Sequence, residues 1–273
     1  VSEAPARAPL HRTIAEFLAA KYLAKAVADG LPVYRALALM EGEDQRAVDP
    51  LRGLYAWLAV HSLEERTLLI DRDPLTVILY GDVLLFSTSE KRRIFEALAR
   101  EARRYPWFRN GHWERGPFGA LATADMTPYF TECLASKSRD VTHEVVLDCV
   151  CDAIAHGNAG IPIAGIVKVV RDPSHHLSTR RSALDALLNH TSPTEASIRD
   201  LLGDVVADRI TDPDDQLLGR LLMASFPGAI DAKELVGYLR MPKQRNFIGR
   251  YYMFWAHGVV DRAADAELPA IAD

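Results

Sequence analysis

Apolar residues recur at three- and four-residue steps along most of the chain, which is the periodicity of amphipathic α-helices. The first such segment runs from Pro9 to Asp29, where the larger apolar side chains stand among alanines: Ile14, Phe17, Leu18 and Tyr22. Gly30 then supplies a helix end, and Pro32 supplies the next helix start. No stretch alternates apolar and polar residues as a half-buried strand would. The pattern therefore predicts an all-α fold.

Capping motifs mark the helix starts. Ser87–Glu90 and Ser192–Glu195 both match the capping box, in which a hydroxyl and a carboxylate bind opposite backbone amides. Pro193 would occupy the first helical position of the second box, where its missing N–H costs nothing. Four Asp-Pro pairs give further start signals with Asp as the cap: Asp49-Pro50, Asp73-Pro74, Asp172-Pro173 and Asp212-Pro213. Such frequent caps predict many short helices joined by short turns.

The second half of the chain predicts a regular array of helix pairs. Candidate first helices begin about 30 to 37 residues apart, near Val141, Leu177, Asp214 and Gln244. Their second helices are expected over Ile161–Val170, Glu195–Ile210 and Ala232–Arg240. A two-helix unit of about this length is typical of HEAT-like arrays, in which each pair buries its apolar face against the next. We therefore predict a HEAT-like α-solenoid of antiparallel helix pairs.

The segment Tyr105–Phe118 interrupts this pattern because it is too rich in Gly and Pro to be helical. A sub-domain junction is expected there. The predicted organisation is a region that ends in a linking helix over residues 1–30, an irregular helical sub-domain over residues 31–118, and HEAT-like repeats over residues 119–273.

Composition narrows the class of protein. Of the 273 residues, 49% are hydrophobic and 25% are charged, which predicts a folded chain. The net charge of −5 argues against a nucleic-acid partner, because phosphate contacts require a basic excess. We expect a cytoplasmic protein with no membrane partner, since the sequence contains neither a transmembrane stretch nor the apolar core of a signal peptide. The chain starts without Met, so we expect a piece of a longer protein.

The three cysteines, Cys133, Cys149 and Cys151, are an odd number, which suits a reducing compartment without a disulfide framework. Cys149 and Cys151 stand two residues apart on a predicted helix and point in different directions, so they cannot share a metal ion. We predict that the cysteines are small buried side chains.

Residues Leu10–Leu23 contain His11, then four residues, then Glu-Phe-Leu-Ala-Ala from Glu16. This run resembles the end of the winged-helix region in NACHT-type STAND NTPases, where it leads into helical repeats. The resemblance implies that residues 1–30 are the end of a winged-helix-like region with its linking helix. Later segments are similar to bacterial members of that family: Leu54–Leu58, Asp73-Pro74, Tyr80–Asp82 and Phe118–Ala122. The resemblance covers roughly the first 125 residues, and the remainder matches only as a generic helical repeat.

The resemblance implies a cytoplasmic switch protein that binds ATP or ADP in an upstream module, detects a trigger through its repeats and oligomerises to activate an effector. Several bacterial members act in antiphage defence. At the position of His11, the family's histidine contacts a phosphate of ADP. This chain has no Gly-x4-Gly-Lys-Ser/Thr motif, so we expect no cofactor and no ATPase activity in the chain itself. Glu16 is expected to pair with Arg12.

One helix carries an acidic stripe at four-residue steps: Glu144, Asp148, Asp152 and His156. A metal site on this stripe would need carboxylates from several helices and a Glu-x-x-His step, which the stripe does not have. We therefore predict a solvent-facing stripe and no metal site. His175-His176 lies in a turn without a clustered partner and is interpreted as part of a loop.

The most basic stretch is diluted by acids and interleaved with aromatic residues: Lys91, Arg92, Arg93, Arg100, Arg103, Arg104, Arg109 and Arg115. It could bind single-stranded nucleic acid, but an amphipathic helix followed by an aromatic connector is the favoured interpretation. Partner contacts are predicted at Trp107, Arg109, Trp113 and Arg115, the residue types that dominate interfaces. We expect Trp107 rather than Trp113 to be buried. Phe247–Trp255 is interpreted as the core of a late repeat, or as an interface if several rings are exposed.

These features favour a non-catalytic sensor or scaffold that binds a protein ligand or its own upstream NTPase module, with possible oligomerisation of the full-length protein. No familiar nucleophile motif occurs. One alternative is a HEAT-like enzyme of the DNA glycosylase type, which requires a basic concave groove with an acid and aromatic residues. A passive structural adaptor is the other.

Overall fold

The computed structural model describes residues 11–109, 116, 118–189, 194–264 and 271, and over these ranges the protein is all-α, as predicted. The first helices are α1 (Arg12–Ala28), α2 (Val33–Leu37), α3 (Arg52–His61), α4 (Arg66–Arg72), α5 (Pro74–Tyr80) and α6 (Thr88–Arg104). The later helices are α7 (Thr127–Ala135), α8 (Val141–His156), α9 (Ile163–Arg171), α10 (Leu177–Asn189), α11 (Glu195–Val206), α12 (Gln216–Ser225), α13 (Ala232–Tyr238), α14 (Arg250–Met253) and α15 (Val259–Arg262). Within the described ranges, no helix is both long and apolar enough to cross a bilayer.

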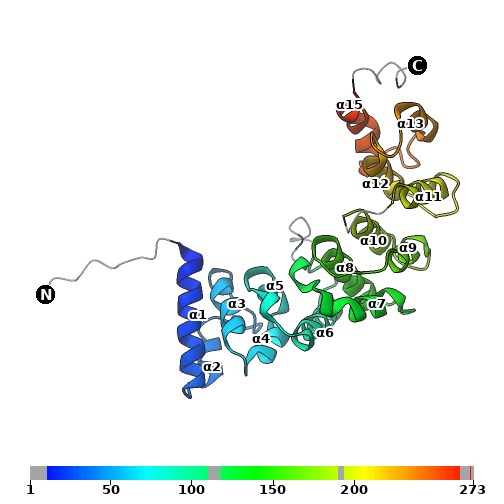
Figure 1. Ribbon diagram of the computed structural model, residues 1–273. Helices are drawn as coiled ribbons and strands as arrows, with labels where there is room; N and C mark the ends of the chain where they lie inside the picture. The colour runs from blue at the N-terminus through cyan, green and yellow to red at the C-terminus, as the bar shows by residue number, and fades with distance from the viewer. Residues whose placement is uncertain (1–10, 110–115, 117, 190–193, 265–270, 272–273) are drawn as a thin grey trace, which may run out of the picture.

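The helices follow one another in chain order along a bend (Figure 1). Most packing is between near neighbours in sequence: α1 on α3, α3 on α5, α6 on α8, α8 on α10, and α10 on α12. In the second half, α8, α10 and α12 lie on the inner side of the bend, and α9, α11 and α13 lie on the outer side (Figure 1). Each pair thus buries its apolar face against the next pair, which is an all-α helical repeat.

Several predicted helix boundaries are confirmed. Ser87 and Glu90 form the capping box of α6, and Asp73 caps α5 with Pro74 at its first position. Gly30 ends α1 with φ +107°, a conformation that glycine adopts without steric cost, and Leu31 N donates to Ala26 O at 2.9 Å.

Other start signals were wrong. α11 begins at Glu195 with Thr194 as its cap, because the Thr194 hydroxyl accepts from Ser197 N at 3.2 Å; Ser192 and Pro193 lie outside the described residues. Asp172-Pro173 ends α9 instead of starting a helix. In that turn Asp172 accepts from Ser174, so its carboxylate stabilises the loop.

The predicted pitch holds through most of the array. First helices α8 and α10 begin at Val141 and Leu177 as predicted, and α12 begins two residues after the expected Asp214. The start near Gln244 was wrong, since α14 begins at Arg250. Buried Asp215 explains the delay: it accepts from Lys243 N at 2.7 Å and from Arg240 at 2.9 Å, which holds that segment in a loop.

The last two inner helices approach very closely. A Cβ at Gly219 of α12 would lie 2.2 Å from the backbone nitrogen of Tyr251 in α14. The Tyr251 side chain is fully buried, and its hydroxyl donates to Arg240 O at 2.6 Å. Glycine therefore permits a backbone contact between α12 and α14 that no other residue allows, and this contact places Arg250 beside α12.

Candidate functional site

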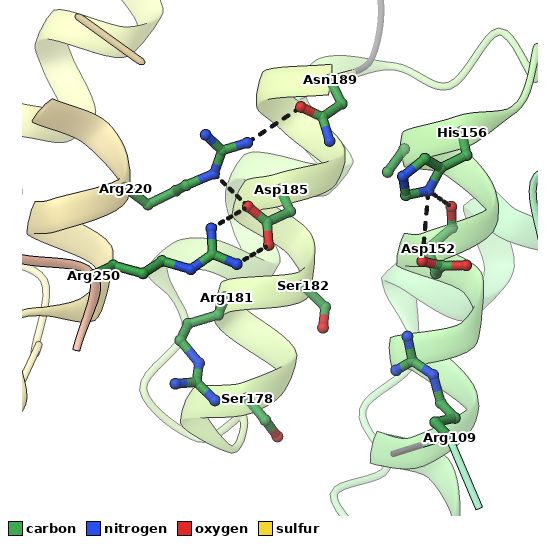
Figure 2. A pocket seen from close by; sticks show the side chains of 11 residues that line it. Arg109, Asp152, His156, Ser178, Arg181, Ser182, Asp185, Asn189, Arg220 and Arg250 are labelled. Atoms are coloured by element: carbon green, nitrogen blue, oxygen red, sulfur yellow. Dashed lines mark hydrogen bonds and ion pairs between the residues drawn. The ribbon is translucent and has the colours of Figure 1, made fainter. Parts of the chain in front are cut away.

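The inner side of the bend is hollowed where α8, α10, α12 and α14 come together. This arginine hollow has a volume of about 510 Å³ and is lined mostly by polar side chains (Figure 2): Arg109, Asp152, Ala155, His156, Ser178, Arg181, Ser182, Asp185, Asn189, Arg220 and Arg250. The α10 residues among them recur at three- and four-residue steps and so share one helix face. A hollow of this size can hold a small ligand or side chains of a partner.

Asp185 binds two arginines that come from different helices (Figure 2). Arg250 donates from Nη1 and Nη2 to the two carboxylate oxygens, each at 3.2 Å. Arg220 donates through Nε to the same carboxylate and through Nη2 to Asn189 Oδ1 at 3.2 Å. One carboxylate thus joins α10, α12 and α14 at the wall of the arginine hollow.

Arg181 has a different environment. It stands one helical turn before Asp185, lies on the side of α10 that carries the Asp185 network (Figure 2), and is partly exposed. Within the described part of the chain, its guanidinium has no hydrogen-bond or ion-pair partner. The arginine hollow therefore contains an uncommitted cation beside two paired ones.

The acidic stripe of α8 does not face solvent, so that prediction was wrong. Glu144 is 8% exposed and Asp152 is 9% exposed, because the connector after α6 and the turn before α10 cover this side of the helix. Asp152 accepts from Phe118 N at 3.4 Å and lies 3.5 Å from His156 Nδ1. Its three acids are buried or partly buried, and each faces a donor on a neighbouring segment, whereas His156 at the end of the stripe is exposed.

Asp148 of this stripe faces Arg109 of the connector, with 3.6 Å between Oδ2 and Nη1. Burial raises the pKa of Asp148, and the Arg109 guanidinium opposes that shift. Arg109 also lies over the Phe118 ring, 5.7 Å from its centroid. Arg109 was predicted to contact a partner; the structure places it at the edge of the arginine hollow but bound mainly to α8.

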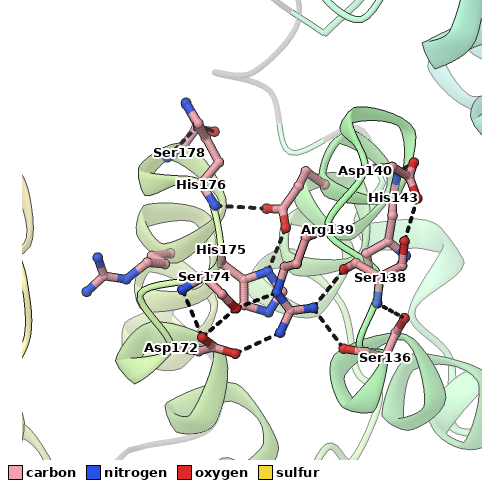
Figure 3. Close-up of polar contacts among 12 residues, drawn as sticks. Ser136, Ser138, Arg139, Asp140, His143, Asp172, Ser174, His175, His176 and Ser178 are labelled. Carbon is pink, nitrogen blue, oxygen red and sulfur yellow. Dashed lines mark hydrogen bonds and ion pairs between the residues drawn. The ribbon is translucent and has the colours of Figure 1, made fainter.

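Glu144 fixes the turn before α10 (Figure 3). Its carboxylate lies 2.8 Å from buried His175 Nδ1 and accepts from His176 N at 3.2 Å. His175 does lie in a turn, as predicted, but the expectation that it has no partner there was wrong. In the same turn Asp172 accepts from Arg139 of the segment before α8 at 2.7 Å, so two polar contacts join α8 and the segment before it to the turn before α10 (Figure 3).

Trp107 is 64% exposed, contrary to the expectation of burial. It lines a second hollow of about 600 Å³, the tryptophan hollow, together with Pro106 and the α8 side chains Val141 and Val145. Its neighbour Phe108 supplies the buried ring of the connector instead. Predicted contact residues Trp113 and Arg115 lie outside the described residues.

The two hollows adjoin. Arg109, Ser178 and Arg181 line both of them. The surface therefore runs without interruption from an apolar part at Trp107 to a cationic part at Arg181. An arrangement of this kind can recognise a ligand that carries apolar and anionic groups side by side.

His11 is exposed at the N-terminal end of α1 and makes no capping bond. The predicted pair between Arg12 and Glu16 is confirmed at 2.7 Å. Within α1, this pair orders the first turn and leaves the imidazole free to meet another group.

The structure also places the candidate metal-ligating and thiol side chains. Among the described residues, no group of three or more His, Cys, Asp or Glu side chains could hold a metal ion. Cys149 and Cys151 are fully buried as predicted, and Cys133 is partly buried. Burial raises the pKa of the Cys149 thiol to about 12, so it is not a nucleophile at neutral pH.

The basic stretch on α6 is partly paired with acids. Arg93 and Arg100 both bind Asp71, and buried Lys91 donates to the Thr123 hydroxyl at 2.7 Å. This agrees with an amphipathic helix rather than a nucleic-acid surface, although Lys91 is buried rather than solvated. 

The C-terminal aromatic segment divides between core and surface. Tyr251 and Phe254 are buried, whereas Phe247 and Trp255 are each 39% exposed. The core interpretation is therefore correct for part of Phe247–Trp255.

The sequence analysis did not single out Arg181, Asp185, Arg220 or Arg250. A local signal existed on α10, where polar residues at three- and four-residue steps interrupt an Ala/Leu helix. The partners Arg220 and Arg250 follow Asp185 by 35 and 65 residues, and no local pattern connects them.

Comparisons with protein-family models, with curated proteins and with solved structures find no match to this chain.

Proposed function

We propose that this chain is a non-catalytic, HEAT-like solenoid region that senses or scaffolds by binding a protein partner on the inner side of its bend. The observation that carries the proposal is the continuous surface formed by the tryptophan and arginine hollows on α8, α10, α12 and α14. Exposed Trp107 supplies a rigid apolar anchor, and Arg181 supplies an uncommitted planar donor. Trp and Arg are among the residues that contribute most to protein–protein binding energy.

We further propose that the chain belongs to a cytoplasmic STAND signalling ATPase of the NACHT type, one used in antiphage defence. The support is the run from His11 to Ala20 and the position of His11, exposed at the end of the array where a nucleotide module would adjoin it. Sequencing the gene upstream of Val1 tests this. A P-loop and a Walker-B strand there are expected, and a start codon immediately before Val1 would contradict the proposal.

A site-specific photo-crosslinking experiment tests the partner proposal. The photoreactive residue benzoylphenylalanine replaces Trp107, so that one exposed aromatic ring takes the place of another. In a matched control it replaces Lys168, which is exposed on outer helix α9. Irradiation of producing cells should give a discrete protein adduct from position 107 and none from position 168. Equal adducts from both positions, or none from position 107 in cells exposed to the trigger, would overturn it.

One observation favours a nucleic-acid enzyme as a second candidate: the arginine hollow combines guanidinium groups, the acids Asp152 and Asp185, and a nearby exposed Trp107. The pairing of Asp185 with two of these arginines counts against it. Fluorescence anisotropy with a labelled single-stranded oligonucleotide distinguishes the two. Affinity that survives at 0.15 M salt and falls steeply with added salt would favour the enzyme, because phosphate contacts release counterions.

A further inference from the structure

The arginine hollow concentrates positive charge from three helices. Arg181 of α10, Arg220 of α12 and Arg250 of α14 together line its wall, with Asp185 as the carboxylate between them. Their backbone positions are fixed by helix packing, so the side chains cannot all move away from one another. The free energy of such a cluster falls when an anion enters it.

Asp185 satisfies only part of this charge. Its two oxygens accept from Arg220 Nε and from Arg250 Nη1 and Nη2. Arg181 remains unpaired within the described part of the chain, and neither Arg220 Nη1 nor Arg250 Nε contacts a carboxylate there. Two guanidinium groups thus share one carboxylate and a third lies nearby without one (Figure 2), which leaves donors for one or two further acid groups.

The neighbouring acids do not compensate for this surplus. Asp148 is bound by Arg109, and Asp152 lies against His156 and Phe118 N on the α8 side of the hollow. Burial raises the pKa of Asp152, with Arg109 opposing the shift, so its carboxylate carries less negative charge near acid pH than an exposed one. Glu144, which lines the tryptophan hollow, is engaged by His175 and His176 N, so Arg181 is left without a carboxylate partner among the described lining residues.

The tryptophan hollow determines what kind of anion fits. It continues directly from Arg181 and Ser178 to Trp107, and its wall includes Val141 and Val145. A bare inorganic anion would leave this apolar surface exposed to water. A peptide chain can place an apolar side chain against Trp107 and a carboxylate at Arg181, because side chains a few residues apart span such a distance.

We propose that the arginine and tryptophan hollows together receive an acidic segment of the protein partner, in which Asp or Glu side chains bind Arg181, Arg220 and Arg250 while an adjacent apolar side chain packs on Trp107. The inference rests on the proposed function, namely that the partner is a protein. Guanidinium groups suit carboxylates because their parallel N–H donors match the two oxygens. The positive charge of the arginine hollow is local and modest, and the whole chain has a net charge of −5. The hollow therefore suits a short acidic segment better than a nucleic-acid backbone, which needs many phosphate contacts.

Selection from a random peptide library tests the ligand class without knowledge of the partner. The full chain of 273 residues is immobilised, and bound peptides are counter-selected on the Arg181→Glu variant. Enriched peptides should combine Asp or Glu with Trp, Phe or Leu within a few positions. By anisotropy, Arg181→Glu should weaken their binding by about tenfold or more, the loss expected when a charge-assisted hydrogen bond becomes a repulsion.

Two control variants keep this test specific. Arg245→Glu makes the same charge change at an exposed residue outside both hollows and should leave binding unchanged. Trp107→Ala should weaken the same peptides without altering the melting temperature. Arg181→Glu should also fold normally, since Arg181 makes no contact that the described fold needs; if it does not, Arg181→Gln is the substitute and should still weaken binding.

Three outcomes would overturn the inference. The enriched peptides could lack acidic residues, or they could bind the Arg181→Glu variant and the original chain with equal affinity. The third is that millimolar inorganic phosphate displaces all selected peptides. Neutral peptides captured at Trp107 would refute the acidic ligand and leave the proposed protein partner intact. Failure of the photo-crosslinking experiment would instead remove the protein partner itself.

Discussion

At the scale of single residues, the connector after α6 contains two neighbouring aromatic rings with opposite environments. Trp107 is largely exposed in the tryptophan hollow, whereas Phe108 is buried in the hydrophobic core. Burial decides whether truncation creates a cavity, so the two residues should respond differently to the same substitution.

Phe108→Ala should lower the free energy of unfolding by about 3–5 kcal/mol, as large-to-small changes of buried aromatic residues do. Trp107→Ala should change it by no more than about 0.5 kcal/mol, because the ring leaves most of its surface in water. Urea denaturation followed by circular dichroism measures both. A large loss of stability in Trp107→Ala would show that this ring is a structural anchor and would remove it from the proposed interface.

Asp172 provides a pH-dependent contribution to stability. The hydroxyl and amide of Ser174, and then the Arg139 guanidinium, lower the pKa of this carboxyl well below its usual range. The charged form is therefore favoured in the folded state. Its stabilisation is complete above the unfolded-state pKa of about 3.9 and is lost as pH falls towards the lower folded-state pKa.

Asp172→Asn should accordingly destabilise the protein at pH 6, and the difference from the original chain should shrink as pH falls from about 4 to 2. Urea midpoints across that range measure the effect. Asp200→Asn is the matched control, since Asp200 is exposed on α11 and has no hydrogen bond or ion pair among the described residues. A difference that stays constant down to pH 2 would mean that the carboxylate charge is not what stabilises the turn.

At the scale of helices, local sequence determined most of what could be predicted. The starts of α6, α8 and α10 follow from caps and apolar periodicity within a few residues, so the sequence alone predicts them. The environment of the α8 stripe depends on the connector and on the turn at His175, which are distant in sequence. A four-residue period shows that residues share a face, but it does not show what covers that face.

The same distinction explains why the arginine hollow was missed. Asp185 and Arg181 lie on one recognisable face of α10, but Arg220 and Arg250 come from later helices whose order along the bend sets the contact. The start of α14 was also misplaced, because the loop that delays it is held by Asp215, a residue of the preceding unit. Contacts between residues of different repeats can be identified only when the structure shows how the repeats stack.

Alanine substitutions at two glycines test how closely α12 and α14 approach each other. A methyl group at Gly219 would meet the backbone of Tyr251, so Gly219→Ala should separate α12 from α14 and cost at least about 1–3 kcal/mol, the range for overpacked cores. Gly203→Ala on α11 has open space and should stabilise its helix by about 0.5–1 kcal/mol. Thermal unfolding of both variants measures this. Equal effects would contradict the close approach of α12 and α14.

At the scale of the whole molecule, the order of packing predicts an elongated particle. Each helix in the described ranges packs mainly on neighbours in sequence, and the array follows a bend instead of closing on itself (Figure 1). Such a chain has no contact that would bring α1 near α12. An elongated array also leaves its inner side open along the hollows, as capture of a partner would require.

Small-angle X-ray scattering should therefore give a radius of gyration clearly above about 19 Å, the value expected for a compact globule of 273 residues. The distance distribution should have a long tail rather than a symmetric peak. Measurements at several concentrations separate this shape from self-association, which would make the radius rise with concentration. A concentration-independent radius near 19 Å would mean that the array folds back on itself, which would close the inner side and remove the basis for the proposed binding surface.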